Sequence, residues 1–153
     1  MIISVDFDGT VVDQSTDFDD AAVDHLVLLP NAREALQALK RAGHILILYS
    51  GRANIAHRED WKLNPLWRDG IVPFDEKRWE KSRAIFEARY QAMLDFVAKE
   101  LPDVFDVIDD GRQGKPTWDL LIDNSAIGRF GLDVTWTDIV DLYGESASQQ
   151  SEG

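Results

Sequence analysis

The chain has 153 residues, of which 28 are acidic and 16 are basic, so its formal net charge is −12. This length fits one domain with a full hydrophobic core, and the negative charge disfavours long nucleic acids and anionic membranes as partners. The absence of cysteine excludes disulfides and thiolate metal sites. Because the sequence shows neither a basic, apolar leader nor a run of about 20 apolar residues, we expect a cytoplasmic protein without a membrane span.

The first predicted elements form a β-α-β unit. Residues 2–5 and 45–49 are short apolar runs rich in β-branched residues, typical of strands buried in a parallel sheet. Between them, residues 30–43 carry apolar side chains at helical spacing, with proline at the start and glycine at the end. We therefore expect a right-handed crossover between two parallel strands.

The second half of the chain continues the alternation. Residues 80–101 show apolar side chains at helical spacing and are followed by Pro102, which predicts a second long helix. Two apolar runs that end in aspartate, 104–109 and 120–123, predict further strands, and 132–136 is a weaker fifth strand candidate. Alternating strands and helices indicate an α/β protein with a doubly wound parallel sheet in a three-layer α/β/α arrangement.

Two stretches do not fit this scheme. Residues 61–79 contain three tryptophans and two prolines without periodicity, so we expect a short ordered insertion over the sheet. Its tryptophans either pack as a satellite cluster, which is the interpretation we favour, or contact substrate. Residues 144–153 are polar and predicted to be a disordered tail without function, which leaves residues 1–143 as a single domain.

Polar side chains follow three of the predicted strands. Asp6 and Asp8 follow the first strand, Ser50 and Gly51 follow the second, and Asp123 follows the fourth. Ligands of open parallel sheets bind at the carboxyl ends of the strands, so we expect these residues to share one site. Carboxylates that meet in a pocket repel each other unless a cation neutralises them, and oxygen ligands suit Mg²⁺. A serine hydroxyl, backbone amides and a lysine are groups that bind a phosphoryl group.

These stretches resemble the motifs of the haloacid dehalogenase superfamily of phosphatases. DFDGTVV (6–12) resembles its first motif, LYSGR (48–52) its second, and GKPTWDLLIDN (114–124) its third and fourth together. The matches occur in the family's order and spread over most of the chain. The resemblance implies a Rossmann-like core and Mg²⁺-dependent phosphoryl transfer through an aspartyl phosphate. The short interval between the first two motifs is typical of a small, nearly capless member.

The resemblance also implies roles for three aspartates. Asp6 would be the nucleophile, and Asp8 would act as general acid and base. Mg²⁺ would be held by the carboxylates of Asp6 and Asp123 and by the main-chain carbonyl of Asp8. From the residues alone, a structural interpretation stays open: Asp6 and Asp8 as turn residues at a strand end, and Asp123 as an Asx-turn residue.

The phosphate-binding roles follow from the same resemblance. Ser50 and the Gly51 amide would bind the phosphoryl oxygens, and Lys115 would orient Asp6 and neutralise charge. Here too a structural interpretation stays open, with Ser50 as a helix cap and Lys115 as a solvated loop residue.

Some residues depart from the motifs or have no role in them. Asn124 stands where many relatives carry a second acid, so metal affinity is expected to be lower. Arg52 and residues 57–60 are interpreted as a solvated helix start. Three further aspartates are interpreted as structural: Asp109, Asp110 and Asp119. Of these, Asp119 is the one most expected to have a functional role instead.

The sequence is consistent with three classes of function. The first is a phosphatase that acts on a small phosphomonoester, either a sugar phosphate or a nucleotide. The second is a non-catalytic module that binds metal or phosphate and uses the 61–79 segment as a partner interface. A polynucleotide end phosphatase is a third class, which the acidic charge disfavours. The sequence indicates neither the substrate nor the oligomeric state.

Overall fold

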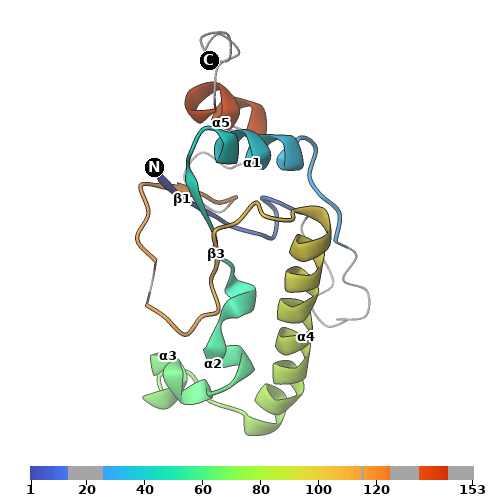
Figure 1. Ribbon diagram of the computed structural model, residues 1–153. Helices are drawn as coiled ribbons and strands as arrows, with labels where there is room; N and C mark the ends of the chain where they lie inside the picture. The colour runs from blue at the N-terminus through green and yellow to red at the C-terminus, as the bar shows by residue number, and fades with distance from the viewer. Residues whose placement is uncertain (14–25, 115, 125–134, 145–153) are drawn as a thin grey trace, which may run out of the picture.

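A parallel sheet forms the centre of the computed structural model (Figure 1), which describes residues 1–13, 26–114, 116–124 and 135–144. Within these residues the sheet has the strand order β3-β2-β1-β4, and its three pairings are all parallel. Parallel strands covered by helices confirm the predicted α/β class. The strands are β1 (Ile2–Val5), β2 (Ile45–Leu48), β3 (Val107–Ile108) and β4 (Leu120–Ile122).

Within the described ranges, three helices cover the sheet. They are α1 (Ala32–Arg41), α4 (Glu76–Glu100) and α5 (Trp136–Tyr143). Figure 1 shows α1 and α5 lying together on one side of the sheet and α4 on the other. The predicted helix at 80–101 is confirmed, but α4 begins earlier because the Asp75 side chain caps it by accepting from the Arg78 amide.

The prediction of a fifth strand at 132–136 is wrong for the two residues that the structure describes, 135 and 136. Residues 132–134 lie outside the described residues, whereas Trp136 is the first residue of α5. The reason is a capping box, in which Thr135 and Asp138 each accept from the other's backbone amide. The predicted tail likewise falls outside the described residues, except for Gly144.

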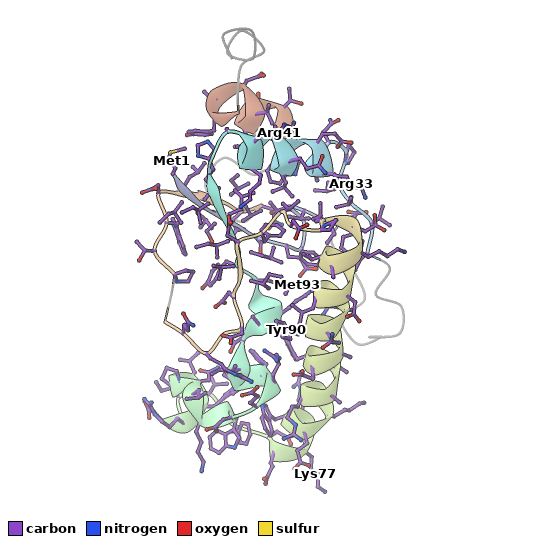
Figure 2. The ribbon with its side chains drawn as sticks, in the orientation of Figure 1. Met1, Arg33, Arg41, Lys77, Tyr90 and Met93 are labelled. Atoms are coloured by element: carbon purple, nitrogen blue, oxygen red, sulfur yellow. The ribbon has the colours of Figure 1, made fainter. Side chains whose placement is uncertain are left out.

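The core lies between the sheet and the helices. Val5, Phe7 and Leu36 are fully buried, and Phe7 meets Phe96 of α4 edge to face. Figure 2 shows Tyr90 and Met93 pointing from α4 toward the interior of the molecule, where both are buried. The alternating strand and helix pattern therefore located most of the apolar core correctly.

A helical arm, residues 54–89, extends away from the sheet, so the expectation that residues 61–79 lie over the sheet is wrong (Figure 1). These residues form short helices and the first turn of α4 at the far end of the arm. After β2 come a short 3-10 turn and small helices: the turn and the first small helix pack beside α4, the next 3-10 turn packs on that helix, and the last short helix packs on that turn (Figure 1). The small elements are η2 (Gly51–Ala53), α2 (Ile55–Arg58), η3 (Trp61–Leu63) and α3 (Pro65–Arg68). No helix in the described ranges is long and apolar enough to cross a membrane.

Aromatic rings gather in the helical arm. Trp61 stacks on Phe74 with ring centroids 4.0 Å apart, and Trp67 and Trp79 also contact Phe74. The interpretation of these tryptophans as a satellite cluster is therefore confirmed. His57 joins this aromatic cluster through an edge contact with Trp67.

Candidate active site

The candidate site lies at the carboxyl edge of the sheet, where the chain changes direction. From β1 the chain moves outward through β2 to β3, and then returns to place β4 on the other side of β1. Hydrogen bonds continue past the strand ends: the Asp6 amide donates to Ile122 and the Tyr49 amide to Val5, both at 2.9 Å. Such a switch in strand order is the usual position of a ligand crevice in an open parallel sheet.

A first cavity of about 350 Å³ opens at this edge. Asp6 and Asp123 border it from adjacent strands, while Ser50 and Gly51 border it from the turn after β2. Asp109, which follows β3, also lines its wall. The structure thus brings together most of the residues that the motifs single out.

The carboxylates in this cavity repel one another. Burial, then the charges of Asp123 and Asp8, raise the pKa of Asp6 to about 7, against the hydrogen bonds from the Phe7 amide and the Thr10 hydroxyl. Burial also raises the pKa of Asp109. An acidic pocket of this kind is a donor set that suits a divalent cation such as Mg²⁺.

The predicted Mg²⁺ ligands can be compared with the geometry. Asp123 is close enough for its charge to raise the pKa of Asp6, so two carboxylates fit the predicted set. Across the described ranges no group of three or more acidic or histidine side chains is arranged to hold a metal. The predicted Mg²⁺ site does not need three such side chains, because its third donor is the main-chain carbonyl of Asp8.

Thr10 connects Asp6 to β4 and α5. Its hydroxyl donates to Asp6 Oδ2 at 3.4 Å and accepts from the Asn124 amide at 3.0 Å, while its carbonyl accepts from Trp136 Nε1 at 2.9 Å. Gly9 is required beside it, since its φ is 77° and an added Cβ would lie 2.4 Å from the Asn124 side chain. Thr10 is fully buried and fixes the orientation of Asp6.

Ser50 serves as a cap. Its hydroxyl oxygen accepts from the Arg52 amide at 3.2 Å at the start of η2, which confirms the structural interpretation of this residue. That role does not remove it from the site, because a hydroxyl that accepts still has its own hydrogen to donate. Gly51 adjoins it, and among the described residues no heavy atom beyond its chain neighbours lies within 4 Å of an added Cβ, so its backbone is open to a ligand.

The side chain of Asp8 does not border the first cavity. Its carboxylate accepts two hydrogen bonds from Arg52, at 2.8 Å from Nε and 2.7 Å from Nη2, and Arg89 Nη2 lies 3.9 Å away. It borders a second cavity of about 310 Å³ instead. Both arginines are only 3% exposed, so the interpretation of Arg52 as solvated is wrong. Its charge is satisfied by a bidentate ion pair that no local pattern signals.

Arg58 is also buried, against the solvated interpretation of residues 57–60. Its Nη1 donates to the carbonyls of Ala53, at 3.2 Å, and Asp110, at 3.4 Å, and its guanidinium lies 3.7 Å from the centre of the Tyr90 ring. It joins the turn after β2 to the loop after β3. Both segments line the first cavity, so Arg58 stabilises its shape.

The remaining residues named from the sequence differ in whether they lie at the first cavity. Asp119 accepts from the Ile2 amide at 2.7 Å, at the start of β1 and therefore far from the cavity, which confirms a structural role. Asp110 accepts from the Arg112 amide. Asp109 is the residue that sequence reasoning missed, although it ends a strand as Asp6 and Asp123 do. Lys115 lies outside the described residues.

Comparison with known proteins names no function. No protein-family model matches the sequence, and no curated protein matches it. A solved structure of a conserved protein from Bacteroides thetaiotaomicron is similar, with 20% identity and a TM-score of 0.45, over 100% of this chain and 93% of its own. A likeness at this level carries no argument about function, which has to come from the site itself.

Proposed function

We propose that the protein is a Mg²⁺-dependent phosphohydrolase of the haloacid dehalogenase type, with a Rossmann-like core. It would act in the cytoplasm, as a single domain over residues 1–143, on a small phosphomonoester. One observation carries the proposal: two repelling carboxylates, Asp6 and Asp123, share a cavity with Ser50 and Gly51. Acidic metal ligands thus face neutral phosphate ligands across one pocket.

The chain's own groups account for the first half-reaction. A bound Mg²⁺, held by Asp6, Asp123 and the Asp8 carbonyl, would supply positive charge that keeps Asp6 ionised and neutralises the ester. Asp6 then forms a bond to phosphorus as the bond from phosphorus to the leaving oxygen breaks. Ser50 and the Gly51 amide donate to the phosphoryl oxygens, whose charge spreads during the transfer.

Asp8 would handle protons in both halves. The leaving oxygen needs a proton as it departs, and the water that later attacks the aspartyl phosphate has to lose one; such proton transfer contributes roughly 10²–10⁴ in rate. To donate to the leaving oxygen in the first half, Asp8 would have to carry a proton at that stage, and it has to meet that oxygen at the second cavity, which it borders. Once it has given up this proton, its carboxylate, beside Arg52, is the form that accepts a proton from water in the second half.

A generic ester assay tests the proposal. We expect hydrolysis of p-nitrophenyl phosphate with Mg²⁺, none with EDTA, and strong loss in Asp123→Asn. The matched control is Asp119→Asn, because Asp119 also lies beside β4 but at the opposite end of the sheet. Equal rates in Asp123→Asn and Asp119→Asn would overturn the assignment.

A non-catalytic metal- or phosphate-binding module is the second candidate. The observation that favours it is the double hydrogen bond between Arg52 and Asp8, which holds the predicted acid away from the first cavity. This candidate predicts that Mg²⁺ and inorganic phosphate bind, as measured by calorimetry, while no ester is hydrolysed. Turnover that depends on Asp6 excludes it.

A further inference from the structure

The second cavity adjoins the first. Gly51 and Asn54 border both, so the turn after β2 is a wall that the two cavities share. Asp6 borders the first cavity and Asp8 the second, with only Phe7 between them in the sequence. The predicted nucleophile and the predicted acid therefore serve different cavities.

This division fits the geometry of phosphoryl transfer. The attacking and leaving oxygens lie roughly in line on opposite sides of phosphorus. A phosphoryl group in the first cavity, attacked by Asp6, would direct its leaving oxygen away from that carboxylate. The residue that protonates this oxygen has to stand on the leaving side, and Asp8 stands at the second cavity.

We propose that the second cavity receives the leaving group of the substrate and selects a planar heterocycle, so that the substrate is a nucleotide and not a sugar phosphate. The inference rests on the proposed function and deepens it. It also assigns a use to a cavity that the sequence motifs do not describe.

The walls of the second cavity carry the inference. His57 and Phe86 border it and stack on each other, with ring centroids 4.5 Å apart and an interplanar angle of 15°. Burial lowers the pKa of His57, which keeps its ring neutral. Trp67 supports His57 from behind, edge to face at 5.1 Å. Aromatic walls of this kind bind flat rings through stacking and apolar contact.

Polar groups complete the cavity. The exposed Asn54 contributes an amide group, whose oxygen accepts from the Ala56 amide. Arg52 and Arg89 also border the cavity, where the Arg52 guanidinium donates to Asp8 and to the Arg89 carbonyl. A heterocycle offers a flat face and acceptor atoms at its edge, which matches ring walls with the NH2 group of Asn54 beside them. A sugar offers hydroxyl groups around a puckered ring and gains little from an aromatic wall. The volume of about 310 Å³ is sufficient for a small ring system.

Kinetics with matched variants test the selection. In Phe86→Leu we expect kcat/KM for adenosine 5′-monophosphate to fall roughly tenfold, the order of one lost base-stacking contact, with ribose 5-phosphate unaffected. The control is Phe74→Leu, the same substitution in the same aromatic cluster, at a residue that borders neither cavity. Equal losses for both substrates, or for both variants, would overturn the inference.

A binding experiment separates this inference from the proposed function. Adenosine and ribose are titrated into the wild-type chain in EDTA while the His57 ring signals are followed by NMR. We expect shifts with adenosine only. If adenosine shifts the His57 signals and no ester is hydrolysed, the second cavity binds a heterocycle as proposed, but the proposal of a phosphohydrolase is wrong. If esters are hydrolysed and adenosine does not shift the His57 signals, the proposal of a phosphohydrolase is supported, but the inference about the second cavity is wrong.

Discussion

The carboxyl edge of the sheet and the helical arm are held together in different ways. At the sheet edge, backbone hydrogen bonds between strands fix the position of each following residue, such as Asp6 on Ile122 and Asp109 on Leu48. In the helical arm, short helices are held by side chains, among them the buried Arg58 and the stacked rings of Trp61 and Phe74. Strand topology therefore places the proposed reacting groups, whereas side-chain packing shapes the cavity proposed to select a ligand.

The largest difference is expected in reaction rate. Asp6→Asn at the sheet edge should reduce hydrolysis of acetyl phosphate by at least roughly 10³-fold, since it removes the attacking oxygen. Phe74→Leu in the helical arm should leave this rate unchanged, because the substrate has no ring to recognise. Initial rates of phosphate release at saturating Mg²⁺ measure both. A comparable loss in Phe74→Leu would show that the arm takes part in the chemistry.

The next largest effect concerns stability at Arg52, which donates to Asp8 at the sheet edge and to the Arg89 carbonyl in the helical arm. Arg52→Ala leaves Asp8 without its bidentate partner and should lower the free energy of unfolding by about 3 kcal/mol. Arg68→Ala breaks another arginine–aspartate pair, with Asp69, but one that is exposed to solvent, so no measurable change is expected. Urea denaturation of the three proteins gives the comparison. Equal midpoints would mean that Arg52 does not stabilise the junction of the two regions.

A smaller effect is expected from pH in the metal-free protein. The pKa of Asp6 is raised from its ordinary value of 3.8 to about 7. As pH rises between these values, the unfolded chain releases this proton first, so folding loses stability, and the loss is complete above about 7. Asn at this position releases no proton. In EDTA, the melting temperature of Asp6→Asn minus that of wild type should therefore increase from pH 5 to pH 7. A difference that stays constant over this range would contradict the prediction.

The smallest effect is expected behind the second cavity. Trp67 contacts His57 edge to face but does not border the cavity. Trp67→Leu should raise KM for adenosine 5′-monophosphate by less than roughly threefold, well below the effect expected for Phe86→Leu, since an aromatic edge contact contributes about 0.5–1.5 kcal/mol and only part of it acts on the ligand. A larger change in KM would place Trp67 in direct contact with substrate.

Predictability from sequence differs between the regions for a physical reason. Asp6, Ser50 and Asp123 could be grouped because each follows a buried strand, and parallel strands end at one edge. The same rule would have placed Asp109 at the cavity, had it been applied to β3.

The buried arginines could not be found in this way. Arg52 finds its partner Asp8 44 residues away, and Arg58 joins two loops through backbone carbonyls. Neither interaction leaves a periodic or local signal, and a polar residue without periodicity is normally exposed. The second cavity depends on these contacts, so the sequence did not indicate it.

Mass spectrometry after brief exposure of the Mg²⁺-loaded protein to acetyl phosphate tests the central claim, that Asp6 attacks phosphorus, most directly. We expect one added phosphoryl group on the Asp6 peptide of the wild-type chain and none on Asp6→Asn. A phosphoryl group on another residue of the wild type, or full turnover by Asp6→Asn, would contradict it.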